Sequence, residues 1–457
     1  MAAVADSPAV VVGGGLAGIA AALRLADNGR SVLLLEGRNR LGGAAFSFRR
    51  GDLSIDNGQH VFLRCCEAYQ WLLRRVGAQG DVTMQQRLDI PVLRADGRSA
   101  RLRRLPGVPA PAHLGGALAG YGLLSPMDRL RAVRGALALK RLDPANPRLD
   151  AQTLGGFLRA HGQNDATIAA LWGIVATATL NLDPDEASLR LAAKVFRTGL
   201  LDHAPAGDVG YARAPLGELH STKPLRALAS AGVEVLLGHR VDSVEPGGIV
   251  RATGATGSRA WTSNTVVLAT PHREAFAAAP ALATSLAAQA AGLGATPIVN
   301  VHVVYDRRVT DLPFAAGVNS PVQWFFDRTD TSGLSAAHPA GQYLAVTVSA
   351  AKDEIDQPTR MLTQQFLEEL ARLLPAAQSA EVIDTFVTRE RRATFRQAAG
   401  SSALRPTTSS GFDGVWLAGS WTDTGWPDTM EGAVRSGIIA AEAALDLPAH
   451  AVLGFAA

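Results

Sequence analysis

A glycine-rich turn near the start of the chain constrains the fold more than any other feature. It follows a short apolar strand expected at Val10–Val12 and opens a helix of small and apolar residues. The turn consists of Gly13, Gly14, Gly15, Leu16, Ala17 and Gly18. Its three spaced glycines match a dinucleotide-binding fingerprint, in which they permit a tight turn, the close approach of a pyrophosphate and the packing of helix on strand. The N-terminus of the helix then offers unpaired N–H groups to phosphate oxygens.

A carboxylate supports this interpretation. The next expected strand, at 31–35, leads directly into Glu36, which is eighteen residues past Gly18. A carboxylate at this strand end accepts hydrogen bonds from the ribose hydroxyls of an adenosine and repels a 2′-phosphate. An ordinary structural turn is the alternative, but the order strand, turn, helix, strand and acid favours a nucleotide site.

Composition excludes several classes of protein. The chain has 457 residues, of which 47% are hydrophobic and 19% charged, so it is neither disordered nor collagen-like. A net charge of +3 does not indicate a nucleic-acid binder. Cys65 and Cys66 are the only cysteines, which excludes a disulfide framework and favours a reducing compartment. The basic residues are nearly all arginine, and the four lysines are Lys140, Lys194, Lys223 and Lys352.

The order of the expected elements predicts two interleaved domains. Strands expected within 232–244, 260–270 and 414–418 and a helix at 431–445 extend the first β-α-β unit into a Rossmann-like α/β domain made of 1–80, 205–275 and 400–457. Two insertions, 81–204 and 276–399, are expected to form an α+β substrate domain. The first is mostly helical in pattern, and the second mixes strands with a helix.

Two further motifs resemble the flavoproteins of the amine oxidase and phytoene desaturase superfamily. The second glycine motif, which follows Glu36, contains Gly37, Arg38, Gly42, Gly43 and Ala44, and the C-terminal motif contains Gly419, Ser420, Thr429 and Met430. The resemblance implies FAD as cofactor, with the last helix directed at the flavin and the backbone of Val241 at the adenine. Many members have arginine in place of Ala44, so Arg38 or Arg40 is expected to supply that charge, or the contact is missing.

The chain differs from the amine oxidases of this superfamily. It has Asn300 where they usually carry a lysine, and Thr429 where they carry an aromatic residue. The segments 56–61 and 424–437 resemble instead the hydroxysqualene dehydroxylases. This resemblance implies the reductive removal of an allylic hydroxyl from hydroxysqualene or a similar long isoprenoid in hopanoid-type lipid synthesis, with hydride from reduced FAD in an apolar tunnel and electrons from a reduced nicotinamide or a reductase.

Such a reaction needs a general acid beside the leaving oxygen. Asp56 and His60 are the candidates, with the alternative that both only fix their loop by hydrogen bonds. Gly58 and Gln59, together with His60, are expected to contact the cofactor. Asp428 and Glu431 are further candidates but are expected to cap the last helix. The sequence shows no metal-ligand cluster.

A basic stretch at 94–148 predicts a contact with membrane. It has eleven basic and three acidic residues, interleaved with apolar ones, which suits an anionic bilayer. The alternative is a solvated helical face whose charges pair elsewhere. We expect a cytoplasmic protein on the inner face of the cell membrane, because no signal peptide or spanning segment is evident. Two other functions remain open, a desaturase of a carotenoid-like polyene and a non-catalytic isoprenoid-binding or escort protein.

Overall fold

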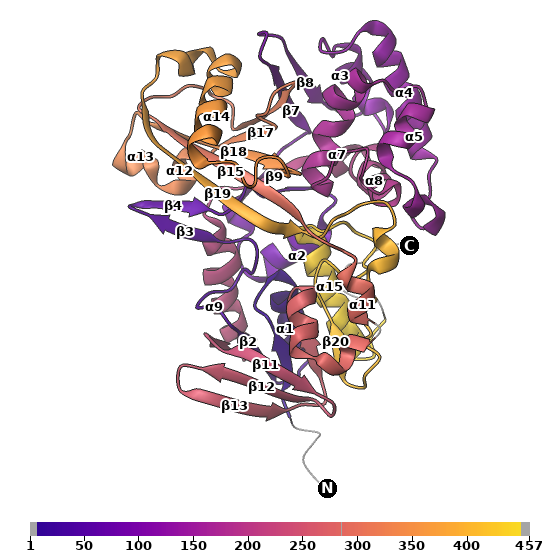
Figure 1. Cartoon of the computed structure of the whole chain (residues 1–457), viewed down its shortest axis with the longest axis vertical. Coiled ribbons are helices and arrows are strands. Elements are labelled where there is room, and N and C mark those ends of the chain that lie inside the picture. The colour runs from indigo at the N-terminus through magenta and orange to yellow at the C-terminus, as the bar shows by residue number, and fades with distance from the viewer. Residues whose placement is uncertain (1–6, 285, 449–457) are drawn as a thin grey trace.

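A parallel five-stranded sheet carries the first glycine turn in the computed structural model, which describes residues 7–284 and 286–448 (Figure 1). Its strands, in spatial order, are β10 (Glu234–Leu237), β2 (Val32–Glu36), β1 (Ala9–Val12), β14 (Val266–Leu268) and β20 (Val415–Leu417). All neighbouring strands run parallel. Strands that are far apart in the sequence therefore meet beside the glycine turn.

Both faces of this sheet are covered, as expected for parallel strands of almost uniformly apolar residues. Ala9 and Val11 of β1 face one core, and Val10 and Val12 face the other. The first core is covered by helices α1 (Leu16–Asp27), α2 (Glu67–Arg75), α9 (Lys223–Ser230) and α15 (Met430–Ala444). The second is covered by β11 (Arg240–Glu245), β12 (Ile249–Gly254), β13 (Gly257–Thr262), α10 (His272–Ala278) and α11 (Leu286–Ala291).

A seven-stranded sheet forms the second layer of the molecule. In spatial order its strands are β19 (Val382–Thr394), β15 (Thr296–Tyr305), β18 (Gln342–Ser349), β17 (Trp324–Asp327), β16 (Phe314–Val318), β7 (Asp89–Arg94) and β8 (Ser99–Arg103). Helix α14 (Thr359–Leu373) buries Leu362, Phe366 and Leu370 against one face. The hairpin of β3 (Ser47–Arg50) and β4 (Leu53–Asp56) contributes Ile55 to a smaller core with β15 and β18.

Helices of the first insertion gather at the upper right of Figure 1. They are α3 (Gly115–Ala119), α4 (Pro126–Lys140), α5 (Leu154–Ala160), α6 (Asp165–Thr167), α7 (Gly173–Leu180) and α8 (Leu189–Phe196). An apolar cluster joins them to the edge of the seven-stranded sheet, where Ile174 of α7 meets Phe314 and Phe326. Short strands β5 (Val61–Leu63), β6 (Val82–Met84) and β9 (Val209–Ala212) and helices α12 (Thr329–Ser332) and α13 (Leu334–Ala337) complete the described chain.

Two details differ from the simplest sequence pattern. Residues 89–103 form the β7–β8 hairpin at the edge of the seven-stranded sheet, although the first insertion is mostly helical in pattern. Helices α10 and α11 pack with the five-stranded sheet, so residues 276–278 and 286–291 lie with the nucleotide-binding layer. Among the described residues, no helix is both long and apolar enough to cross a bilayer.

Candidate functional site

The first glycine turn is held by close backbone contacts. Gly13 has φ +105°, a conformation that side chains rarely adopt. A Cβ on Gly18 would lie 1.8 Å from the Gly13 carbonyl oxygen, so helix α1 can approach the turn only because this residue is glycine. The Gly14 amide donates to Glu36 Oε2 at 2.7 Å, which ties the turn to the end of β2.

Glu36 lies where a nucleotide-binding carboxylate is expected. Its second oxygen accepts from the Arg38 amide at 2.8 Å, and its backbone carbonyl accepts from the His239 amide at 2.9 Å. Gly37 permits the chain to pass close to Arg240, because a Cβ there would be 3.6 Å from the Arg240 Cα. The backbone of Val241 therefore follows directly on the residue beside Gly37, consistent with the predicted adenine contact.

The second glycine turn touches the first. Gly42 and Gly43 have φ +97° and +57°, and a Cβ on Gly43 would lie 2.9 Å from the Gly15 Cα. The Arg38 and Arg40 guanidinium groups both donate to the Gly43 carbonyl, at 3.0 and 3.2 Å. Burial, followed by repulsion from Arg38, lowers the pKa of Arg40. Two guanidinium groups held close together attract an anion. Arg38 and Arg40 can therefore supply the positive charge that Ala44 lacks.

The Asn57 side chain holds the second glycine turn in place through hydrogen bonds. Its side-chain oxygen accepts from the Phe46 amide, and its side-chain nitrogen donates to the Ala44 carbonyl and to Glu390, each at 2.9 Å. The Asn57 carbonyl in turn accepts from Asn300 Nδ2 at 3.0 Å. Asn300 is therefore buried, and its side chain holds the backbone of Asn57 in place.

Helix α15 packs beside the first glycine turn. Thr429 caps the helix by accepting from the Gly432 amide, and a Cβ on Gly437 would lie 2.0 Å from the Ala17 carbonyl, so α15 packs directly on α1. The Gly419 amide donates to Ser436 Oγ at 2.7 Å. The amide of Met430, in the first turn of the helix, has no intrahelical acceptor and is available to a ligand.

The expectation that Asp428 and Glu431 cap α15 is wrong, because Thr429 does so. Glu431 instead accepts from the amides of Ala68 and Tyr69, at 3.2 and 2.8 Å, and thus caps the neighbouring helix α2. Its carboxylate also pairs with Arg435 at 2.5 Å. Asp428 accepts from the Phe395 amide at 2.7 Å and bonds Ser420, and burial raises the pKa of its carboxyl.

The contacts of Asp56 favour the alternative that it fixes its loop. Oδ1 accepts from the Ser47 hydroxyl at 2.6 Å and from the Leu216 amide at 2.9 Å, and Oδ2 pairs with Arg328 at 2.5 Å. These three donors engage both oxygens of a residue that is 5% exposed. Asp56 holds the loop, which is the structural alternative.

His60 remains a candidate for contact with the flavin or substrate. Within the described chain its imidazole makes no hydrogen bond, and its Nε2 lies beside Gly58, 3.5 Å from where a Cβ would be. Burial lowers the pKa of His60, with Arg328 adding to the effect and Asp56 opposing it. The neutral imidazole can orient a ligand, but it is a poor proton donor at neutral pH.

The residues present fit FAD. Of the nine buried side-chain polar atoms that lack a partner among the described residues, two lie beside the glycine turns: Gln59 Nε2 and Thr270 Oγ1. Thr270 flanks Gly13, and Gln59 lies in the 57–60 loop beside the second turn. Unpartnered buried polar groups are rare unless a ligand or water satisfies them, so both sides of the site require a polar ligand.

Sequence reasoning missed three residues that support the site: His220, Arg328 and Arg435. His220 lies beneath the second glycine turn, with Nδ1 3.1 Å from the Ala45 carbonyl and Nε2 2.8 Å from the Tyr69 hydroxyl. Burial lowers its pKa to about 4, so it is neutral. His220 and Arg328 lie outside the motifs, and their partners are distant in the sequence. Arg435 lies in the 424–437 segment, and its spacing of four residues from Glu431 on a helix does signal the pair.

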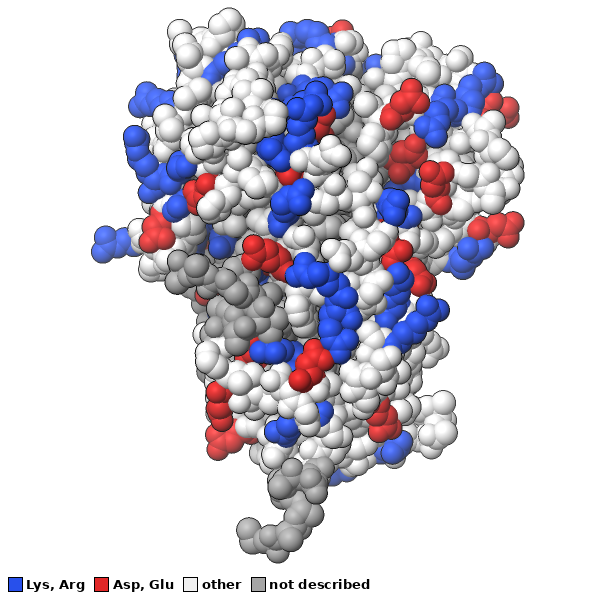
Figure 2. All heavy atoms as spheres, turned by 180° about the vertical axis from the view of Figure 1, so that it is seen from behind, with Lys and Arg blue, Asp and Glu red and all other residues white. Residues whose placement is uncertain are grey.

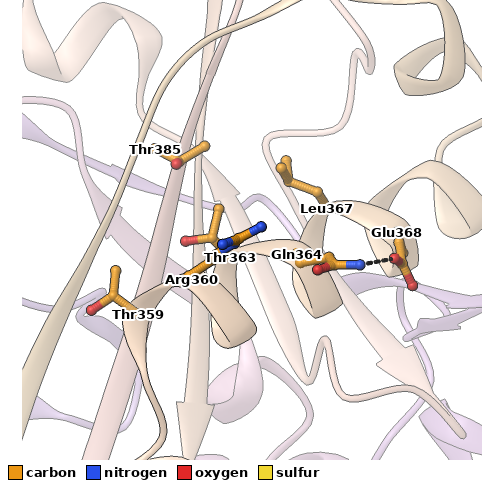
Figure 3. A pocket seen from close by; sticks show the side chains of 7 residues that line it. All are labelled: Thr359, Arg360, Thr363, Gln364, Leu367, Glu368 and Thr385. Carbon is orange, nitrogen blue, oxygen red and sulfur yellow. Dashed lines mark hydrogen bonds between the residues drawn. The ribbon is translucent and has the colours of Figure 1, made fainter.

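A shallow surface pocket of about 520 Å³ lies on α14 and is not part of this site (Figure 3). Its lining consists of Thr359, Arg360, Thr363, Gln364, Leu367, Glu368 and Thr385. Figure 3 shows one internal contact there, from Gln364 to Glu368. Among the described residues, no group of acidic, histidine and cysteine side chains could hold a metal ion.

Known proteins resemble this chain over nearly its full length. The family model described as flavin containing amine oxidoreductase matches residues 16–445. Hydroxysqualene dehydroxylase of Rhodopseudomonas palustris is 31% identical, covering 95% of this chain and 97% of that protein, and the enzyme of the same name from Sinorhizobium fredii is 27% identical with the same coverage. Zeta-carotene desaturase of Arabidopsis thaliana is 26% identical, covering 93% of this chain and 83% of that protein.

Solved structures show the same fold. An oxidoreductase from Methanosarcina mazei has a TM-score of 0.70 at 15% identity, covering 94% of this chain and 98% of that one. Cyclohexylamine oxidase from Brevibacterium oxydans has a TM-score of 0.64 at 20% identity, covering 96% and 99%. The expected α/β fold and FAD cofactor are thus confirmed. The chain belongs to the flavin containing amine oxidoreductase family, and it is an FAD-dependent oxidoreductase of the hydroxysqualene dehydroxylase type, related to the carotenoid desaturases.

Proposed function

We propose that the protein removes the allylic hydroxyl of hydroxysqualene reductively and yields squalene. The observation that carries this proposal is the full-length likeness to the Rhodopseudomonas palustris enzyme, which bears that activity in its name. The site is consistent with it, because the lysine and the cage aromatic of amine oxidases are replaced by a buried Asn300 and by Thr429, which serves as a helix cap.

The cofactor would lie across the two glycine turns. Glu36 would hold the adenosine ribose, Val241 the adenine, and Gly13, Gly15 and Gly43 the pyrophosphate together with Arg38 and Arg40. The first turn of α15 would meet the flavin, where a helix N-terminus favours the negative charge that collects on reduction. When bound and reduced, FAD supplies a hydride.

The protein's own contribution to this reaction is orientation, exclusion of water and a proton. The 57–60 loop presents His60 and Gln59 to the flavin side of the site. The apolar cluster of α7, β16 and β17 would receive a long hydrocarbon and keep water from the reacting carbon. A proton must reach the leaving oxygen so that it departs as water, and Asp56 is not free to supply it.

The test uses enzyme photoreduced without oxygen and then mixed with hydroxysqualene. We expect one squalene, identified by mass, for each flavin reoxidised. The same enzyme in its oxidised form, mixed with a carotenoid-like polyene, tests the desaturase function that the 26% identical zeta-carotene desaturase favours. Flavin that reacts with neither molecule would contradict both activities and favour a binding or escort role.

Helix α4 supports docking on an anionic bilayer, from which the isoprenoid would enter. Met127, Leu130, Val133 and Leu137 follow one another at helical spacing and are 58%, 66%, 44% and 42% exposed. The exposed Arg131, Arg134 and Arg141 lie on or directly after the same helix. Apolar side chains bordered by arginines suit lipid tails below an anionic headgroup layer. Figure 2 shows further basic side chains along the upper part of the molecule, with uncharged surface between them.

Many basic residues of 94–148, the segment expected to contact the membrane, form ion pairs. We therefore restrict the proposed membrane contact to α4. Arg101 and Arg103 pair with Asp89, Arg104 pairs with the buried Asp208, and Arg94 and Arg98 share Asp96. On α4, Arg131 also pairs with Asp128, at 2.8 Å, whereas Arg134 and Arg141 form no ion pair among the described residues. The solvated-face alternative therefore describes the β7–β8 hairpin better than it describes the end of the helix. We propose a peripheral protein that binds the membrane through α4.

Vesicle co-sedimentation tests this docking. We expect the wild-type protein to bind vesicles that contain phosphatidylglycerol at low salt, and the double variant Leu130→Glu, Val133→Glu to remain in solution. Met361→Glu, on α14, is the matched control, because Met361 is 60% exposed on another helix. Equal binding of all three proteins would exclude α4 as the docking surface.

A further inference from the structure

Lys194 is the only lysine of this lysine-poor chain whose ammonium lacks an oxygen partner among the described residues. Lys140 donates to the Leu201 carbonyl at 2.8 Å, Lys223 pairs with Asp81, and Lys352 pairs with Glu186 at 2.5 Å. Lys194 contacts an aromatic ring instead, with Nζ 4.8 Å from the centre of the Trp426 ring. Its three N–H donors are therefore available to a ligand.

The surroundings of Lys194 place it at the reaction end of the site. Trp426 belongs to the segment that leads into α15, and the Arg435 guanidinium of α15 lies 4.6 Å from the same ring. Glu431, a carboxylate whose charge acts on Lys194, is already bonded to Arg435 and to two amides of α2. Lys194 thus lies on α8, where the helices of the first insertion meet the first turn of α15.

The charges around Lys194 favour loss of its proton. Burial has the largest effect and lowers the pKa of the ammonium, and repulsion from Arg435 and Arg197 adds to it. Glu431 and Cys65 oppose the shift. An amine is useful where a proton must move, whereas arginine keeps its proton at every physiological pH. A lysine without an acceptor in a chain of arginines is therefore a candidate proton donor.

We propose that Lys194 donates the proton to the leaving hydroxyl of the allylic alcohol, which makes it a catalytic residue; this inference rests on the proposed dehydroxylation. The ammonium transfers H⁺ to the hydroxyl oxygen, the carbon–oxygen bond breaks, and water leaves with the bonding electron pair. The allylic cation takes a hydride, with its two electrons, from the reduced flavin. The neutral amine then regains a proton from solvent, so that atoms and charge balance.

The first measurement is kinetic. Lys194→Met should retain bound FAD, seen as flavin absorbance, and should slow single turnover of hydroxysqualene by about 10²–10⁴-fold, the usual contribution of a general acid. Wild-type turnover should fall as pH rises through the pKa of Lys194, because the deprotonated amine has no proton to give. Lys194→Arg should be slow as well and should lack this alkaline limb. Lys352→Met is the matched control and should behave as wild type.

The second measurement does not depend on activity. Lysine labelled with ¹³C at Cε gives four signals in this chain, and the signal that disappears in Lys194→Met identifies Lys194. We expect this signal to titrate at lower pH than the other three, at the pH where turnover falls. The inference is overturned if Lys194→Met turns over like wild type, or if Lys194 titrates together with the other lysines. Wild-type protein that leaves hydroxysqualene unchanged overturns the proposed function as well.

Discussion

The nucleotide end and the reaction end of the site are held in place by different physical means. At the nucleotide end the backbone itself makes the contacts, since the positions of Gly13, Gly18 and Gly43 have no room for a side chain or a conformation that favours glycine. At the reaction end, two buried ion pairs hold the site. Asp56–Arg328 joins segments that are distant in the sequence, and Glu431–Arg435, one turn apart on α15, links that helix to α2 through the Tyr69 amide. Each pair has an N–O distance of 2.5 Å.

The difference predicts how each end responds to substitution. A close backbone contact at a glycine is lost when a side-chain atom is added to that glycine, and a substitution elsewhere does not restore the contact. A buried ion pair fails when one partner is removed, because an uncompensated charge is left behind, yet removal of both charges together is tolerated. Four substitutions test this difference between backbone contacts and buried ion pairs.

Gly18→Ala should abolish FAD binding. The added Cβ would lie 1.8 Å from the Gly13 carbonyl oxygen, so that the turn or α1 must move away from the pyrophosphate position. We expect purified protein without flavin absorbance but with helical content near that of the wild type by circular dichroism. Gly80→Ala is the control, because a Cβ at Gly80 meets nothing within 4 Å. A yellow Gly18→Ala protein would show that the backbone contact is less strict than the geometry indicates.

Arg328→Met should lower the free energy of unfolding by about 3–5 kcal/mol, the usual effect of breaking a buried ion pair. It leaves the buried Asp56 carboxylate with only the Ser47 and Leu216 donors. Asp56→Asn combined with Arg328→Met should recover part of the loss, since Asn retains an oxygen for both donors. Urea unfolding of the wild type and the three variants completes the cycle, and a double variant weaker than Arg328→Met would contradict the ion-pair account.

His220→Gln should make stability less dependent on pH. Because the pKa of His220 is about 4 in the folded chain and about 6.5 when unfolded, acid favours the unfolded state over this window. At about 1.4 kcal/mol per pKa unit, His220 should account for about 2 kcal/mol of the stability lost between pH 7 and pH 5. Glutamine can keep the contacts to Ala45 and Tyr69 without titrating. Urea unfolding at both pH values measures the difference, and parallel losses in the two proteins would argue against a neutral buried histidine.

Thr429→Ala should have the smallest effect, a loss of about 1 kcal/mol in unfolding free energy, because it removes the cap of α15. Thr429→Ser keeps the hydroxyl that accepts from the Gly432 amide and should restore most of the loss. Thermal unfolding of the three proteins measures this. If alanine and serine are equivalent, Glu431 or Asp428 shares the capping role after all.

The elements of the fold that could be predicted from the sequence are those set by patterns over a few neighbouring residues. The β-α-β unit, Glu36 at the end of β2 and the final helix follow from short-range periodicity and glycine spacing, and the structure has them within a residue or two. The mostly helical pattern expected for the first insertion is likewise observed, for example in α4 at Pro126–Lys140.

The contacts that could not be predicted from the sequence depend on partners far away in the chain. Asp56 was expected to be a proton donor, but Arg328 lies 272 residues downstream and no local pattern reveals the pair. Glu431 has the sequence position of a helix cap, yet its carboxylate turns to α2 because Thr429 already satisfies the Gly432 amide. The β7–β8 hairpin belongs to the seven-stranded sheet because its edge is completed by β16, which lies more than two hundred residues later.

The place of β20 in the five-stranded sheet has a consequence for biosynthesis. β20 and the first turn of α15 border the same site as β1, but they are separated from it by about 400 residues. At the usual rate of protein synthesis, roughly 5–20 residues per second, the nascent chain waits about 20–80 s after β1 is made for its last strand. A chain cut short before residue 415 would lack β20 and α15, so that β14 has no neighbour on one side and the face of the sheet under α15 is exposed to solvent. Such exposed apolar surface makes an incomplete chain prone to aggregation.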